Sequence, residues 1–108
     1  MSEKILQINF KFNLSKSEYE QAVSPLANEF IAVAGLRWKI WLMDAARSEA
    51  GGICLFDDES FVQAFLAGPL IAQIGRHPAL SEMSVKQFDV MKNETSITHG
   101  PIRVGVRV

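Results

Sequence analysis

The sequence lacks the features that mark several common protein classes. Cys54 is its only cysteine among 108 residues. An internal disulfide and a cysteine-based zinc site are therefore excluded, which suits a reducing compartment. No apolar run reaches the roughly 18 residues that a membrane-spanning helix needs. The first ten residues also lack the apolar stretch of a signal peptide. We therefore expect a cytoplasmic protein with no membrane partner.

Charge imbalance and cofactor motifs are also missing. The net charge of −1 gives no bulk attraction to nucleic acid. No glycine-rich nucleotide loop is present, and the two histidines, His77 and His99, lie far apart without a carboxylate pattern near them. We expect no metal and no cofactor. The sequence does have 48% hydrophobic residues, enough for the core of one domain over residues 1–108.

Alternation of apolar and polar side chains predicts the strands. Residues 4–12 carry an apolar face on alternate positions, which favours a strand. The residues of this face are Leu6, Ile8, Phe10 and Phe12. Three more strands are predicted at residues 36–43, 49–56 and 82–91. The pair Gly51-Gly52 in the third predicts a bulge or a close backbone approach.

A long helix is predicted between the first two strands. Ser15 followed by Glu18 forms a capping-box sequence, and an apolar stripe then continues to about residue 34. The stripe consists of Tyr19, Val23, Leu26, Phe30 and Val33. Pro25 interrupts the pattern and predicts a kink or a split. Gly35 is a suitable left-handed stop.

Acidic residues 57–59 are predicted to open a second helix, where negative charge suits the helix dipole. The predicted inner stripe of that helix is Phe61, Ala64 and Phe65. Gly68 ends it, and Pro69 starts a short further helix that closes at Gly75. Residues 92–100 are polar. The alternation in residues 102–108 indicates a fifth strand, placed on an edge of its own sheet or of a partner's sheet.

This order predicts an α+β fold of the ferredoxin-like type, β-α-β-β-α-β, with an antiparallel sheet. Residues 4–91 form its core and residues 92–108 a tail. Two helices cover one face of such a sheet. Trp38 and Trp41 point to opposite faces, so the uncovered face still carries a large apolar group. We expect a homodimer packed sheet to sheet; the alternative is that the tail or a loop folds over this face.

Few residues are candidates for binding a ligand, and each has an ordinary structural explanation as well. Tryptophans are mostly core or interface residues, and strand polar residues are mostly solvated. The Asn9 amide can donate one hydrogen bond and accept another at once. A cation such as Lys39 or Arg37 can hold an enolate or a carboxylate. The candidates for a substrate site are Asn9, Trp38, Lys39, Trp41 and His77. No motif for a nucleophilic catalyst is present.

The strings LRWKIWLM and EAGGICLFDDE, with SPLANEF in the first helix and KQFDV in the last strand, resemble the YdhR-type monooxygenases. These belong to the dimeric α/β-barrel superfamily of antibiotic-biosynthesis monooxygenases. The resemblance covers about residues 4–91. Cys54 stands where the family suggests an aromatic residue, which changes the expected shape of the pocket.

The resemblance implies a homodimer with a pocket between sheet and helices in each protomer. It implies oxidation of a small aromatic or polyketide-like substrate by O₂ without flavin, haem or metal. Deprotonation of the substrate would let it pass an electron to O₂, and the protein would supply shape, desolvation and polar anchors. Two alternatives remain: a dimer that binds a small hydrophobic ligand without turnover, and a haem-binding or haem-degrading protein using Asn9 and His77.

Overall fold

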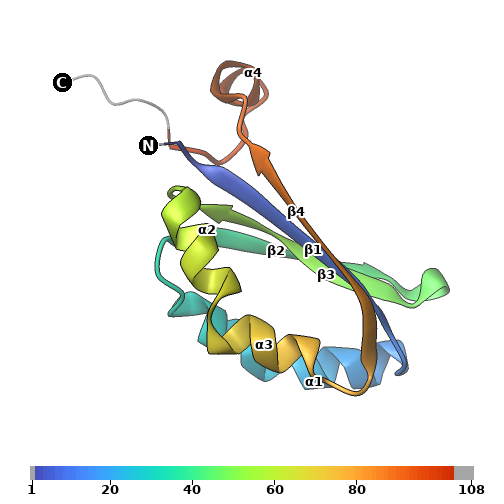
Figure 1. The fold of residues 1–108 in the computed structure, drawn as a ribbon. Helices are drawn as coiled ribbons and strands as arrows, with labels where there is room; N and C mark the ends of the chain where they lie inside the picture. The colour runs from blue at the N-terminus through green and yellow to red at the C-terminus, as the bar shows by residue number, and fades with distance from the viewer. Residues whose placement is uncertain (1, 104–108) are drawn as a thin grey trace.

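A computed structural model describes residues 2–103 of the chain (Figure 1). The strands are β1 (Lys4–Phe12), β2 (Leu36–Asp44), β3 (Glu49–Phe56) and β4 (Leu80–Asp89). The helices are α1 (Lys16–Ile31), α2 (Glu59–Leu66), α3 (Pro69–Gly75) and α4 (Lys92–Ile97), and a short 3₁₀ turn, Ala45–Arg47, joins β2 to β3.

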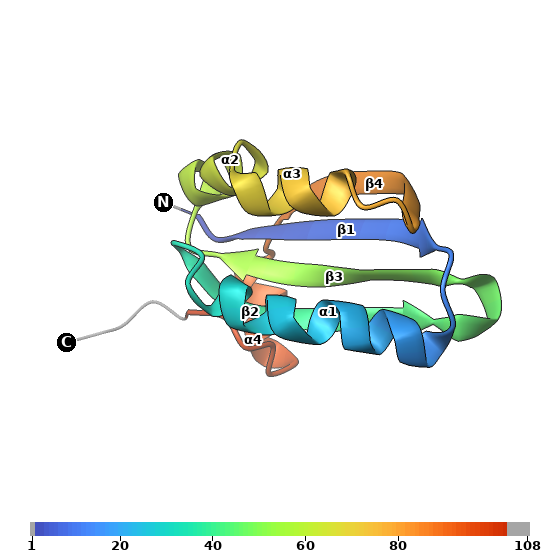
Figure 2. The same cartoon turned by 90° about the horizontal axis from the view of Figure 1, so that it is seen from below.

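The four strands form one antiparallel sheet in the order β2-β3-β1-β4. This is the ferredoxin-like arrangement, so the predicted fold class is confirmed. Helices α1, α2 and α3 all lie on one face of the sheet (Figures 1 and 2). The register between β1 and β3 is continuous through Gly51-Gly52, so the glycines mark a close approach and not a bulge. Strand β4 begins and ends two residues earlier than predicted.

Helix α1 begins with the predicted capping box: the backbone N–H of Glu18 donates to the Ser15 hydroxyl, and the Glu18 carboxylate accepts from the backbone N–H of Ser15. The predicted split at Pro25 is wrong, because the helix runs through it to Ile31. Pro25 and Gln21 are both exposed. Pro25 has no N–H to donate to the Gln21 carbonyl, so water can hydrogen-bond to this carbonyl instead. Gly35 has φ +78, as its predicted left-handed stop requires.

Helix α2 begins at an acidic cap, as predicted. Asp58 accepts hydrogen bonds from the backbone N–H of Ser60 (2.8 Å) and of Phe61 (3.4 Å), and the Ser60 hydrogen bonds lower the pKa of the Asp58 carboxyl. The predicted inner stripe is wrong in one respect. The buried residues of α2 are Val62 and Phe65, whereas Ala64 is exposed. Phe65 is buried and Phe61 packs against the core as predicted, so Val62 takes the place that the stripe gave to Ala64.

The main core lies between the sheet and helices α1 to α3. Every predicted apolar residue of β1 is buried in it. From β3 it takes alternate residues, and from the helices it takes Val62 and three aromatic residues of the inner stripes. The buried members of the core are Leu6, Ile8, Phe10, Phe12, Tyr19, Phe30, Ala50, Cys54, Phe56, Val62 and Phe65.

Helices α1, α2 and α3 leave the opposite face of the sheet uncovered, and we call it the open face. Helix α4 and the segment after it lie on this side, near the start of β1 (Figure 1). The structure places α4 where the sequence indicated only a polar segment. Ile102 and Arg103 are not in a strand; the rest of the predicted fifth strand lies outside the described residues. Leu55 points to the open face and is fully buried, yet it stands outside the main core.

Candidate functional site

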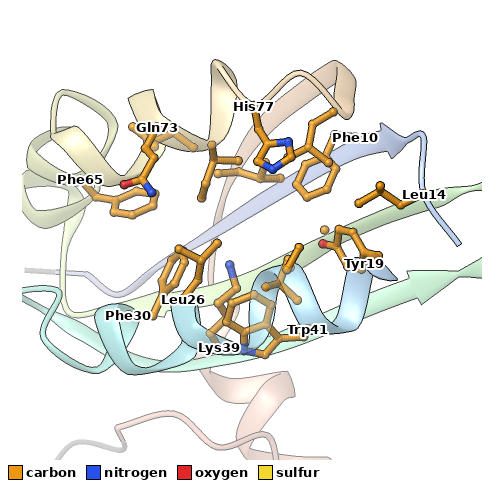
Figure 3. Close-up of a pocket in the computed structure, with 18 residues that line it drawn as sticks. Phe10, Leu14, Tyr19, Leu26, Phe30, Lys39, Trp41, Phe65, Gln73 and His77 are labelled. Carbon is orange, nitrogen blue, oxygen red and sulfur yellow. The ribbon is translucent and has the colours of Figure 1, made fainter. Parts of the chain in front are cut away.

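A cavity lies between the sheet, helix α1 and helices α2 and α3 (Figure 3). Its volume is about 110 Å³. A single water needs only about 10–15 Å³, so the cavity can hold a small organic molecule. Its walls are mostly apolar. The polar side chains that line it are Tyr19, Lys39, Gln73 and His77.

Lys39 supplies the cation of the cavity. It points from β2 toward the helices, and its ammonium lies in the middle of the cavity (Figure 3). The Nζ atom is 3.7 Å from the centre of the Phe30 ring and 4.3 Å from the centre of the Trp41 ring. Within residues 2–103, no carboxylate pairs with it. Burial without a counter-charge lowers the pKa of the Lys39 ammonium, although the neighbouring Cys54 acts in the opposite direction.

Gly52 makes room for the arm of this lysine. A Cβ atom at position 52 would lie 2.7 Å from the Lys39 Cε and 3.0 Å from its Nζ. Any larger residue would therefore displace the ammonium. The close approach predicted from the double glycine is real, and at Gly52 the approaching group is a side chain of the cavity. Cys54, the cross-strand partner of Lys39, is buried, and that burial raises the pKa of its thiol.

Tyr19 supplies a hydroxyl donor. Its ring stacks on Phe12 with the ring centres 4.7 Å apart, and its oxygen points toward the interior of the cavity (Figure 3). Burial raises the pKa of Tyr19 to about 12, so the phenol stays protonated at neutral pH. No group of the described residues hydrogen-bonds this hydroxyl. Sequence reasoning assigned Tyr19 only to the helix stripe, because nothing in the stripe pattern separates a core tyrosine from one whose oxygen faces a cavity.

His77 and Gln73 stand on the opposite side of the cavity from Lys39 (Figure 3). The His77 Nδ1 accepts a hydrogen bond from the backbone N–H of Ala79 at 3.1 Å. The neutral ring therefore carries its proton on Nε2, which is the nitrogen left for a ligand. Gln73 is exposed on α3. Its position in a short helix gave no sequence signal.

The structure brings together three of the predicted site residues, Lys39, Trp41 and His77. It does not bring Asn9 or Trp38 to this cavity, because both point to the open face. Asn9 accepts from the Gln7 amide at 3.0 Å and donates to the Glu49 carboxylate at 3.4 Å.

Trp38 donates from Nε1 to the Pro101 carbonyl at 2.7 Å. Trp41 is therefore the tryptophan of the cavity, where its ring meets the Phe30 ring edge-on at 5.4 Å. The segment that follows α4 lies over part of the open face at Trp38. This agrees with the alternative to sheet-to-sheet packing, in which the tail or a loop folds over this face.

Arg37 is engaged elsewhere, in a group of charges that we call the terminal latch. Its Nη1 lies 3.1 Å from the Glu3 Oε2 and 3.7 Å from the Asp57 Oδ1. The same Glu3 oxygen accepts from the backbone N–H of Arg103 at 3.0 Å, and the Arg103 guanidinium lies 3.6 Å from Asp57. Glu3 is buried. The latch ties the segment after α4 to the start of β1 and of β2.

Among residues 2–103, no group of three or more His, Cys, Asp or Glu side chains is placed to hold a metal ion. No helix in that part of the chain is long and apolar enough to cross a membrane.

Solved structures share this fold. A mutant form of SnoaB, a cofactor-independent oxygenase from Streptomyces nogalater, matches 84% of this chain and 95% of its own with a TM-score of 0.68 at 18% identity. The structure of a haem degrader, MhuD from Mycobacterium tuberculosis, with two haems bound in its active site, matches 81% of this chain and 95% of its own with a TM-score of 0.63 at 19% identity.

A protein of unknown function from Nitrosomonas europaea matches 84% of this chain and 91% of its own, with a TM-score of 0.63 at 21% identity. Identities this low show the fold alone. No curated protein matches the chain.

The sheet order and the helices on one face make the chain a ferredoxin-like α+β domain. The assignment within that class is specific. Residues 5–101 match the family described as "Putative mono-oxygenase ydhR", and the chain belongs to this YdhR family. The family description supports an oxygenase-like role in general terms.

Proposed function

We propose that the chain is an oxygenase that uses no bound cofactor and oxidises a small aromatic substrate with an acidic phenol or enol. The observation that carries this proposal is the position of the Lys39 ammonium against two aromatic rings, with no carboxylate of residues 2–103 paired to it. Burying a cation in apolar surroundings is costly unless an anion joins it. A flat aromatic anion fits both the apolar walls and the charge.

The chemistry begins with ionisation of the bound substrate. The lowered pKa of Lys39 increases the fraction of neutral amine, which can take the proton of the substrate. The ammonium that results then stabilises the enolate in a site of low dielectric. The enolate passes one electron to O₂, and the radical pair combines to a peroxide. In an anthrone, a CH₂ group thus becomes C=O; one oxygen atom enters the product, and the other leaves as water with the two hydrogens.

Oxygen uptake tests this proposal. A panel of anthrones and quinols is added to the wild-type protein, and O₂ consumption is measured against the reaction without protein. We expect uptake to rise with pH as Lys39 loses its proton, and this pH dependence to disappear in Lys39→Met. Trp38→Phe, on the open face, is the matched control and should keep the activity. Tight binding of the panel without oxygen consumption would refute the oxygenase and leave a ligand-binding protein.

Haem is the second candidate ligand, and one observation favours it: His77 lines the cavity, and its Nε2–H is free to donate a hydrogen bond to a haem carboxylate. Titration with haem should then shift the Soret band, and His77→Ala should weaken the shift. A Soret region identical to that of free haem would eliminate this candidate.

We also propose that two copies pack through the open face. Ile40 is 52% exposed and Phe88 is 47% exposed, and both lie on this face according to their cross-strand partners. They stand on the two edge strands of the sheet, β2 and β4, and large apolar groups exposed across one face usually mark an interface. The test is the molar mass in solution by light scattering. We expect a dimer, and a monomer for the double variant Ile40→Lys, Phe88→Lys; a monomeric wild-type protein at micromolar concentration would refute the proposal.

A further inference from the structure

Lys39 is also the one amine among the residues that line the cavity. Its Nζ lies over the faces of Phe30 and Trp41, and in residues 2–103 no carboxylate pairs with it. A lysine is a nucleophile only in its neutral form. Desolvation in an apolar pocket is a recognised way to populate that form, and here burial lowers the pKa of Lys39.

We propose that Lys39 captures small aromatic aldehydes and ketones in this cavity as reversible imines. The amine nitrogen attacks the carbonyl carbon, so a C–N bond forms and a carbinolamine results. The carbinolamine then loses its oxygen as water, together with the two hydrogens that the amine nitrogen carried. The product is a C=N bond, and no oxidant or reductant is consumed.

Two other residues of the cavity favour this reaction. Gly52 lets the Lys39 arm lie against β3, because a Cβ there would come within 2.7 Å of Cε. The amine can thus reach the middle of the cavity (Figure 3). Tyr19 is the donor that can protonate the departing oxygen, because its hydroxyl faces the cavity and burial keeps it protonated with a pKa raised to about 12. Apolar walls exclude water, which slows hydrolysis of the imine.

This activity shares the cavity with the proposed oxygenase reaction but needs no O₂, so the two can fail separately. Imine formation without oxygen uptake would refute the oxygenase alone. Oxygen uptake without imine formation would refute only the present proposal.

Reductive trapping under anaerobic conditions tests it. The wild-type protein is incubated with 2-naphthaldehyde and sodium cyanoborohydride at neutral pH, and the modified lysines are located by peptide mass spectrometry over time. We expect Lys39 to be modified several-fold faster than the exposed lysines 16, 86 and 92. The preference should shrink as the pH approaches 10.5, the ordinary lysine pKa, because the exposed amines then lose their protons as well.

A competitor and two variants complete the experiment. An excess of 2-naphthalenemethanol, which has the same ring system and no carbonyl, should slow the modification of Lys39 and leave that of the exposed lysines unchanged. Lys39→Arg should remove the fast site, and Gly52→Ala should slow it by displacing the amine. Modification of Lys39 at the rate of the exposed lysines, or a fast rate that the competitor does not change, would overturn the proposal; both readings come from the wild-type protein.

Discussion

The two faces of the sheet are built from the same four strands but differ in what covers them. The helix-covered face has an extensive core of buried apolar residues with one lined cavity. On the open face, only the end near the latch is covered, where Leu55 is buried and Trp38 binds the Pro101 carbonyl. Burial of apolar side chains thus holds the helices on one face of the sheet. Hydrogen bonds and ion pairs hold the segment after α4 on the other face. We expect changes on the two faces to have different consequences.

The largest difference should come from adjacent residues of β1. Leu6 is fully buried on the helix-covered face, and Ile5 is half-buried on the open face. We expect Leu6→Ala to lower the free energy of unfolding by about 2–5 kcal/mol, because it leaves a cavity in a packed core. Ile5→Ala should cost about half of that or less. Urea denaturation of both variants checks the prediction; equal losses would show that the open face is packed as tightly as the core.

A smaller effect is expected at the terminal latch. Glu3→Gln removes the buried charge that Arg37 and the Arg103 backbone share. We expect a loss of about 1–3 kcal/mol in the free energy of unfolding and a change in Trp38 fluorescence as the segment after α4 detaches. Asp89→Asn, which breaks an exposed pair with Lys4, is the control and should cost much less, because exposed ion pairs contribute little to stability. Unchanged Trp38 fluorescence in Glu3→Gln would contradict the latch.

The smallest effect, with the opposite sign, is expected at Lys39. Its pKa is lowered in the folded protein, so the folded state binds protons less readily than the unfolded state. Its ionisation therefore destabilises the fold at neutral pH, and this penalty disappears as the pH rises toward 10.5. Lys39→Met should raise stability at pH 7, by less than either loss above, and the gain should vanish above that pH. Lys86→Met, on the exposed edge strand, is the control; a gain that does not depend on pH would contradict the assignment to charge burial.

The alternation of apolar and polar residues was sufficient to predict the four strands, because a period of two is a strong constraint on a half-buried sheet. It assigned Trp38 and Trp41 to opposite faces, and the structure agrees. Periodicity was not sufficient to predict features that depend on solvent exposure or tertiary packing. Pro25 was expected to kink or split α1, but the helix is not split, because the exposed position of Pro25 makes the lost hydrogen bond cheap. The helix α4 was missed because residues 92–97 have no apolar period.

The cavity was only partly predictable, for a related reason. Alternation showed that Lys39 and Trp41 share a face, but which face meets the helices depends on the whole arrangement. Tyr19 and Gln73 reach the cavity through the way the helices cross the sheet, and no local pattern encodes that crossing. The role of Gly52 was visible as a close approach, whereas the identity of the approaching side chain required the strand register.

The terminal latch has a consequence for how the chain folds. It joins residue 3 to residue 103, so it closes the longest loop in the described structure, and closing a long loop costs more chain entropy than closing a short one. The β2–β3 hairpin needs only a short turn, and β1 then has to find β3. Only after that do Glu3 and Arg37 lie near each other to receive the far end of the chain. The latch is thus expected to form last in folding, and to open first when hydrogen exchange reports local unfolding.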